Sequence, residues 1–323
     1  MPNPGTPIGG FIGLETADKQ SYRYHDVPAL SAGRACFRHI LQRTRPDRVW
    51  LPYYVCDAVL QPLRELGIAY SCYRLDEALD ILDGDCRPAE RDLVLYVNYF
   101  GIKSDYVARL AAYYGRQLVV DDTQAFFQRG YPGLWSFNSA RKFLGVPDGA
   151  YLYSPEQNSL PALNRLEPDY RHLVNRIGGD PDIAYQQFLA YEAGLSSEML
   201  AVSSFSQDLL EHLDYVDIAA RRRQNFIHLH QALGVYNQLN PELDPHDVPL
   251  YYPLLTEEPL RERLIKRRIF VPQLWPEMLT RTDRGYAWER RLASNLSPLP
   301  LDQRYNVDHM NRIITEITEL LAP

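Results

Sequence analysis

Two acidic residues and one lysine stand where chemistry could occur, close to predicted strand ends in the middle of the chain. Asp121 ends the apolar run of residues 117–121, Asp122 follows it directly, and Lys142 comes about twenty residues later, ahead of a turn at Gly149. This order suits a pyridoxal phosphate site, because a lysine amine can form a Schiff base with the cofactor aldehyde while an acid keeps the pyridine nitrogen protonated. The spacing also fits a solvated surface lysine, with Asp122 as the N-cap of a following helix, so it selects no single interpretation.

The short motifs of several other enzyme classes are absent. The sequence has no GxxxxGK[ST] phosphate loop, no GxGxxG after a predicted strand, no GxSxG elbow and no HExxH zinc motif. His228 and His230 lie two positions apart on a predicted helix and so point to different faces, which predicts no metal site there. The four cysteines form no CxxC pair, which argues against a zinc site or a disulfide scaffold and favours a reducing, cytoplasmic location.

The composition is that of an ordinary soluble globular protein. The chain has 323 residues, a net charge of −7, 46% hydrophobic and 23% charged residues, which argues against disordered and collagen-like classes. The acidic balance argues against a nucleic-acid binder, and no apolar run approaches the roughly 20 residues of a membrane span. The first ten residues lack the basic and apolar regions of a signal peptide. At roughly 150 residues per domain, the length predicts two domains.

Alternating helical and extended patterns in the first half predict the elements that position these residues. Apolar positions spaced by three and four indicate helices over residues 33–43, 56–66 and 104–114. Apolar, β-rich runs indicate strands over residues 48–53, 68–74, 92–99, 117–121, 134–137 and 150–153. The alternation predicts an α/β fold with a mainly parallel sheet covered on both faces, in which ligands bind at the carboxyl ends of the strands.

The second half predicts a smaller α+β domain. Residues 155–195 show no clear pattern, and residues 197–233 indicate a long helix interrupted near residues 214–217. Extended segments at 249–255 and 268–274 and helices at 257–267 and 306–321 follow. We therefore predict a large cofactor-binding domain over residues 1–215 and a small C-terminal domain over residues 216–323. The basic run at residues 221–223 is interpreted as a solvated helix face.

Stretches ordered along nearly the whole chain carry a family resemblance. They are residues 9–15 (GGFIGLE), 31–37 (SAGRACF), 51–68, 96–101 (YVNYFG), 119–126 (VVDDTQAF), 136–150 (SFNSARKFLGVPDGA), 195–205 and 221–223, followed by PLYYPLL and IFVPQLW. Together they resemble the DegT-type sugar aminotransferases, a fold-type I family that uses pyridoxal 5′-phosphate. The resemblance implies a seven-stranded, mainly parallel sheet between helices, a small C-terminal domain, and a homodimer with sites near the subunit interface.

The resemblance implies roles for three residues beside the cofactor ring. Lys142 would form the Schiff base and shuttle the proton between the substrate carbon and the cofactor. Asp121 would bind the pyridine nitrogen, and it is preferred to Asp122 because Gln124 then stands three positions later, as the family pattern requires. Gln124 would lie by the ring hydroxyl.

A second group of residues would bind the cofactor phosphate. The resemblance places Gly33 and Arg34 at a helix start, where backbone N–H groups and the helix dipole attract anions. Either Ser136 or Ser139 would add a hydroxyl, and the choice between them stays open because the interval to Lys142 is one residue longer than usual from Ser136.

Two departures from the family pattern concern the surroundings of the cofactor. The position that often carries a stacking aromatic residue is Cys56, with Tyr53 and Tyr54 just before it, and any of the three could cover the ring. The stretch in which the family often supplies an Asn to the partner's phosphate reads roughly Ala193-Gly194-Leu195-Ser196, and no Asn aligns.

These implications lead to a functional prediction and two alternatives. The main reading is a cytoplasmic aminotransferase that moves an amino group from glutamate to a nucleotide-linked keto-sugar, as in polysaccharide biosynthesis, with no nucleic-acid or membrane partner. A lyase or dehydratase on the same scaffold is one alternative, although sugar dehydratases of this resemblance replace the lysine. A cofactor-binding relic without activity is the other.

Overall fold

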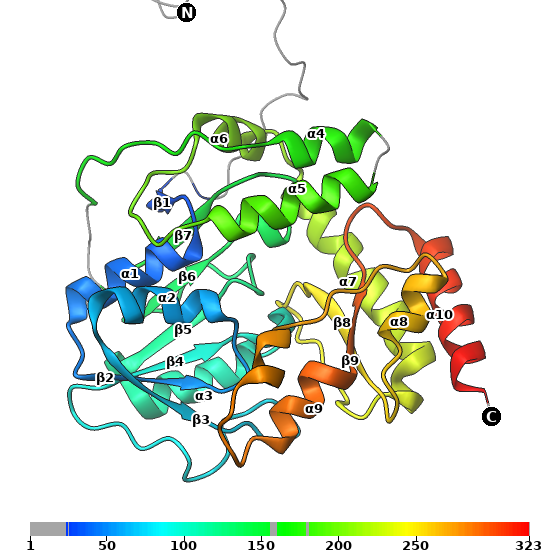
Figure 1. The fold of residues 1–323 in the computed structure, drawn as a ribbon, viewed down its shortest axis with the longest axis horizontal. Helices are drawn as coiled ribbons and strands as arrows, with labels where there is room; N and C mark the ends of the chain where they lie inside the picture. The colour runs from blue at the N-terminus through cyan, green and yellow to red at the C-terminus, as the bar shows by residue number, and fades with distance from the viewer. Residues whose placement is uncertain (1–23, 25, 156–159, 179–180, 323) are drawn as a thin grey trace, which may run out of the picture.

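The computed structural model describes residues 24, 26–155, 160–178 and 181–322, and its centre is a seven-stranded sheet (Figure 1). The strands are β1 (Ala29–Leu30), β2 (Arg48–Pro52), β3 (Ala69–Tyr73), β4 (Leu93–Val97), β5 (Leu118–Asp122), β6 (Trp135–Asn138) and β7 (Ala150–Tyr153), in the order β1-β7-β6-β5-β4-β2-β3. Strands β3, β2, β4, β5 and β6 run parallel, and β7 pairs antiparallel with β6 and β1. The predicted α/β sheet is confirmed, and the stretch at residues 9–15 lies outside the described residues.

Helices cover both faces of this sheet. Successive side chains of a strand point to opposite sides, so continuously apolar strands need a helix layer on each face. Strands β4 and β5 are buried along their whole length. Phe137 of β6 packs against Phe37 of α1 (Gly33–Thr44), and α2 (Asp57–Leu66) lies beside α1. On the other face, Tyr96 of β4 packs against Tyr106 of α3 (Ser104–Tyr114).

The middle of the chain, which has no clear sequence pattern, contains two helices after an irregular segment at residues 160–170. Helices α4 (Arg171–Gly178) and α5 (Pro181–Gly194) pack against each other as a hairpin beyond β1 and β7 (Figure 1). The predicted interruption of the next helix is confirmed, since α6 (Ser204–Glu211) and α7 (Tyr215–Leu233) are separate. The Asp214 carboxylate accepts the N–H groups of Val216 and Asp217 at 3.1 and 2.9 Å, which starts α7 anew.

The C-terminal part contains a second, two-stranded antiparallel sheet, β8 (Tyr251–Leu255) with β9 (Leu296–Pro300). The predicted strand at residues 268–274 is wrong, and β9 was not predicted because its two prolines weaken the strand signal. Pro253 of β8 stands directly opposite Pro298 of β9. Each strand of this two-stranded sheet has an open edge, where proline is tolerated. Helices α8 (Arg261–Lys266), α9 (Ala287–Asn295) and α10 (Val307–Leu321) complete this part. The domain division at residues 215/216 stays a prediction.

The C-terminal part is tied to the carboxyl ends of β2 and β3. Arg281 donates to the carbonyl oxygens of Tyr53 and Val55 at 2.9 and 3.1 Å. The buried Glu289 of α9 accepts the N–H of Leu75 at 2.7 Å. Short 3-10 turns lie at Tyr99–Gly101 (η1), Gly115–Gln117 (η2), Ala140–Lys142 (η3), Gly234–Tyr236 (η4) and Pro276–Thr280 (η5). Within the described part of the chain, no helix has the length and apolar character to cross a membrane.

Gly101→Ala should destabilise the fold far more than Gly67→Ala. Both glycines have positive φ, +71° and +66°, but a Cβ on Gly101 would lie 2.6 Å from the Gln124 carbonyl oxygen, whereas one on Gly67 meets nothing within 4 Å. We expect Gly67→Ala to lower the free energy of unfolding by about 1 kcal/mol and Gly101→Ala by roughly 3 kcal/mol or more. Urea denaturation measures both, and equal losses would contradict the close approach at Gly101.

Candidate active site

The predicted site residues gather where α1 begins beside the carboxyl ends of β5 and β6. A Cβ on Gly33 would lie 3.0 Å from Thr123 Cγ2 and 3.3 Å from the Phe137 ring, so α1 approaches these strands more closely than most side chains allow. Ala32 occupies the N-cap position and, among the described residues, no side chain caps the helix. The Ala35 N–H donates to the Ala32 carbonyl at 3.0 Å, so within the described residues the N–H groups of Gly33 and Arg34 are left for solvent or an anion.

Thr123 joins the two residues predicted to do the chemistry. Its N–H donates to Asp121 Oδ1 at 2.9 Å, and its Oγ1 accepts a hydrogen bond from Lys142 Nζ at 2.9 Å. Asp121 is buried at the end of β5, and Lys142 ends the turn η3. Thr123 was not predicted as a site residue, although its place between Asp121 and Gln124 was the available signal.

The electrostatic surroundings bring the amine of Lys142 closer to its neutral form. Surrounding protein lowers the pKa of Lys142 by disfavouring the ammonium, the Asp121 carboxylate opposes this, and Arg141 and Arg34 add to it. The Lys142 side chain is nevertheless accessible to solvent, so it lies in an opening rather than in the core. Burial raises the pKa of Asp121, while the charge of Lys142 and the hydrogen bond from Thr123 lower it. A lysine in this state is a better nucleophile than a free one.

The two neighbouring aspartates point to opposite faces of the sheet. Asp121 is in register with Phe137, whose ring packs on α1, whereas Asp122 is in register with Asn138. Asp122 Oδ1 accepts hydrogen bonds from Asn98 Nδ2 at 3.1 Å and from the Tyr131 hydroxyl at 3.0 Å. The interpretation of Asp122 as a helix N-cap is wrong, because no helix follows β5 directly.

The same alternation separates the two candidate serines. Ser136 of β6 belongs to the face of Asn138, away from α1, and its Oγ is buried with no hydrogen-bond partner among the described residues. Ser139 follows the strand, and its Oγ is buried with no hydrogen-bond partner among the described residues. The next N–H, of Ala140, donates to the Gly149 carbonyl, and the Gly149 N–H donates to the Ser31 carbonyl. These bonds link Ser139 to the segment that leads into α1.

Of the three residues that could cover a cofactor ring, Tyr53 and Tyr54 are buried and Cys56 is half-buried. Tyr54 is fully buried and packs edge-on against Trp275 at 4.5 Å, and Tyr53 stacks on Tyr286 at 3.7 Å. Tyr54 therefore packs in the hydrophobic core, and its role beside the cofactor stays a prediction. Cys56 is half-buried before α2, and the charge of Lys142 opposes the burial that raises the pKa of its thiol. Of the three, Cys56 is the residue beside Lys142.

Gln124 and Arg34 have partners outside the immediate site. Gln124 Oε1 accepts the N–H of Phe100 at 2.7 Å, in the turn that follows β4. Arg34 contributes its backbone to the start of α1, but its guanidinium donates to Gln61 Oε1 and to the Leu195 carbonyl at 2.9 and 2.8 Å. Its side chain therefore holds the segment after α5 against α1 and α2.

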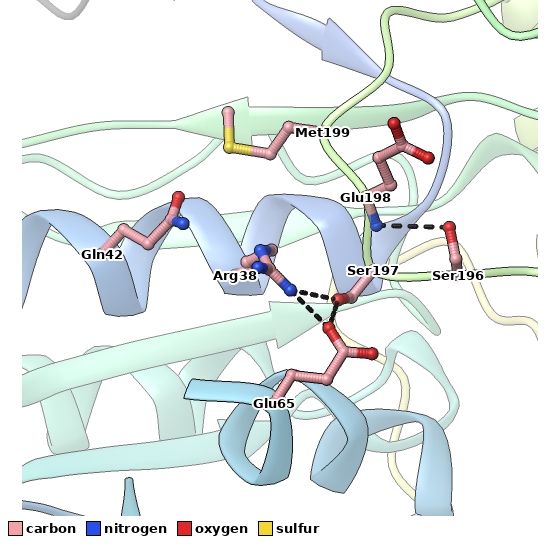
Figure 2. A pocket seen from close by; sticks show the side chains of 7 residues that line it. All are labelled: Arg38, Gln42, Glu65, Ser196, Ser197, Glu198 and Met199. Carbon is pink, nitrogen blue, oxygen red and sulfur yellow. Dashed lines mark hydrogen bonds and ion pairs between the residues drawn. The ribbon is translucent and has the colours of Figure 1, made fainter. Parts of the chain in front are cut away.

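A surface pocket one turn further along α1 continues this polar contact. Figure 2 shows Arg38 directed at Glu65 of α2 and at Ser197, which also contacts Glu65. The pocket is lined by Arg38, Gln42, Glu65, Ser196, Ser197, Glu198 and Met199. No residue predicted for the active site lines it, so the pocket belongs to the seam between α1, α2 and residues 195–199.

Solved structures of aminotransferases share this fold. The sugar aminotransferase CalS13 from Micromonospora echinospora is similar with a TM-score of 0.63 and 16% identity, over 91% of this chain and 87% of that one. A DegT DnrJ EryC1 StrS aminotransferase from Brucella abortus has a TM-score of 0.61, 14% identity and coverages of 91% and 85%. Helicobacter pylori PseC, an aminotransferase involved in the biosynthesis of pseudoaminic acid, has a TM-score of 0.62, 12% identity and coverages of 90% and 85%.

At these identities the likeness establishes the fold, and it confirms the fold-type I architecture expected from the resemblance. No family model matches the sequence, and no curated protein matches it. The activity of this chain is therefore inferred from the residues of its site.

Asp122→Asn should remove a pH-dependent loss of stability. Burial raises the pKa of Asp122 to about 8, so the folded protein keeps a proton that the unfolded chain releases above about pH 4. Stability therefore falls as pH rises through this window, by at most about 1.4 kcal/mol per pH unit. Urea denaturation at several pH values should show a shallower decline in Asp122→Asn than in the wild type. Asp83→Asn, at an exposed position, is the control, and parallel curves for Asp122→Asn and the wild type would contradict this assignment.

Proposed function

We propose that this chain is a pyridoxal-phosphate-dependent aminotransferase of the DegT type. The observation that carries the proposal is the bridge from Lys142 through Thr123 to Asp121, beside the uncapped start of α1. An amine of lowered pKa, a buried carboxylate and an anion site thus occur together. The fold shared with solved sugar aminotransferases supports the same reading.

The residues present fit this cofactor. The buried hydroxyl of Ser139 lacks a partner among the described residues, and Gly33 keeps clear the space that a Cβ would fill. The phosphate would be held by the first turn of α1 and by Ser139, and the pyridine nitrogen by Asp121. Cys56, rather than an aromatic ring, would lie beside the cofactor plane. When bound, pyridoxal phosphate supplies an aldehyde that condenses with amines and a ring that accepts the electrons of a deprotonated carbon.

The chain's own residues supply the proton chemistry. Lys142 Nζ would carry a proton between the substrate carbon and the cofactor. Its lowered pKa leaves more of the neutral amine that can accept this proton. Thr123 Oγ1 orients Nζ by accepting its hydrogen bond. The Asp121 carboxylate interacts with the charge of Lys142. In a site that is partly shielded from water, its negative charge would also favour the protonated form of the pyridine nitrogen.

The substrates follow from the resemblance and from the names of the similar structures. We propose glutamate as the amino donor and a nucleotide-linked keto-sugar as the acceptor, in a cytoplasmic pathway of polysaccharide biosynthesis. Sugar aminotransferases of solved structure share the fold over about nine-tenths of this chain. The presence of Lys142 weighs against a dehydratase.

Lys142→Ala should abolish cofactor attachment and transamination. Added pyridoxal phosphate should give the wild type a visible absorption band that glutamate bleaches, and borohydride should fix the label on Lys142. Turnover in Lys142→Ala should fall by roughly 10³-fold or more, because the proton-transfer group is lost.

The matched control is Lys266→Ala, at an exposed position on α8. A label on Lys266, or retained transaminase activity in Lys142→Ala, would refute the proposal. A band on Lys142 that no amino donor bleaches would favour the lyase or relic readings.

We also propose that the chain acts as a homodimer through the α4–α5 hairpin. Large apolar side chains are exposed along this hairpin, and such patches mark interaction surfaces. They are Tyr170, Val174, Ile177, Ile183, Tyr185, Phe188 and Leu189.

Ile177→Glu should weaken the dimer by at least about tenfold, because it places a charge in an apolar contact. Ile177 is 88% exposed on the hairpin, and Val235, 85% exposed beyond α7, provides the control Val235→Glu. Light scattering over a dilution series measures both. A monomeric wild type, or equal effects of the two substitutions, would contradict this interface.

A further inference from the structure

Arg222 of α7 is a buried cation whose hydrogen-bond partners are all neutral. It is 1% exposed, which corrects for this residue the interpretation of residues 221–223 as a solvated face, whereas Arg221 is exposed as expected. Nε donates to Gln303 Oε1 at 3.0 Å, and the two terminal nitrogens donate to backbone carbonyl oxygens. The Asp302 carboxylate, which accepts hydrogen bonds from Arg304, acts on Arg222 only through its charge. Burying a cation without a hydrogen-bonded carboxylate is costly, so its position needs a reason.

One arm of the guanidinium holds the turn that carries Lys142. Arg222 Nη2 donates to the carbonyl oxygen of Phe143, the next residue after Lys142, at 3.0 Å. Gln303 Nε2 donates to the same carbonyl at 3.0 Å, and the guanidinium lies 4.5 Å from the centre of the Phe143 ring. The C-terminal part of the chain thus grips the lysine turn at a single peptide group.

The other arm leads to the loop that carries Asp121. Arg222 Nη1 donates to the carbonyl oxygens of Pro249 and Leu250 at 3.2 Å each. The Leu250 N–H donates to the Phe100 carbonyl at 2.8 Å, and the Phe100 N–H donates to Gln124 Oε1 at 2.7 Å. Gln124 is three residues beyond Asp121, so a continuous hydrogen-bonded path joins Arg222 to the Asp121 loop.

We propose that Arg222 is a positioning residue that sets the Lys142 turn relative to the Asp121 loop. Its planar fork serves carbonyl groups from two separate segments at once, which a lysine ammonium on a flexible stem cannot reproduce. The effect of Arg222 on kcat rests on the proposed function, whereas its effect on the stability and position of the Lys142 turn does not. Gln303 supports the arrangement by donating to the same Phe143 carbonyl.

The mechanical part is tested on the protein without cofactor, by amide hydrogen exchange. Arg222→Lys and Arg222→Met should speed exchange across residues 140–146 by tenfold or more, and Gln303→Leu, which keeps the charge, should have a smaller effect. Arg221→Met is the control, because Arg221 is exposed and pairs only with Asp217 among the contacts described. Gln303→Leu keeps the test available if Arg222→Met does not fold. Unchanged exchange in Gln303→Leu and Arg222→Lys would overturn the proposal.

The second readout is the pH profile of Lys142 acetylation by acetic anhydride, again without cofactor. Positioning predicts a shifted profile in Arg222→Lys and an unshifted one in Arg221→Met. Faster exchange with an unshifted Lys142 profile would reduce Arg222 to a structural role and overturn the proposal.

With pyridoxal phosphate and glutamate, Arg222→Lys should lower kcat at least tenfold and leave KM within about twofold. If Lys142 takes no label from the cofactor, the proposed function fails while exchange and acetylation still decide the role of Arg222.

Discussion

The parallel register of β4, β5 and β6 is the constraint on which the rest of the site depends. Because paired residues of parallel strands share a face, Asp121 and Phe137 look toward α1, while Asp122, Ser136 and Asn138 look away from it. A slip of one residue would exchange the two aspartates and move the site to the wrong side of the sheet. The close approach of α1 at Gly33 is possible only in this register, since Thr123 and the Phe137 ring form the surface it meets.

The second principle of the molecule is that buried polar groups tie the site to distant parts of the chain. Thr123 connects Lys142 with Asp121 directly. Arg222 connects the turn of Lys142 with the segment before β8 by donating to the carbonyl oxygens of Phe143 and Leu250. Inside a protein such bonds are stronger than in water, and an unpaired member is correspondingly costly. The site is thus held by hydrogen bonds at several points, only some of which belong to the reacting groups.

Local patterns predicted the elements whose signal is carried by neighbouring residues. The continuously apolar β4 and the helices that start at Gly33 and Ser104 are examples. The small sheet was predicted poorly, because β9 reads Leu-Ser-Pro-Leu-Pro and prolines weaken a strand signal. They are tolerated here because each strand of a two-stranded sheet has an open edge, where a missing N–H costs little. Arg222 was misread for a related reason. In a run of three arginines, the position that turns inward is decided by what packs against the helix.

The sequence by itself determined the chemistry available to this protein. The order of Asp121, Gln124 and Lys142 after predicted strands, together with a resemblance spread along the chain, indicated the cofactor and the fold class. Only the tertiary structure showed that Ser136 faces away from α1 and that Tyr54 lies in the hydrophobic core, and only it revealed the contacts of Thr123, Phe143 and Arg222. The physical reason is the distance along the chain over which residues interact. Residue types and spacing can be read from neighbouring positions, whereas the face a side chain occupies, its burial and its hydrogen-bond partners depend on segments more than a hundred residues apart.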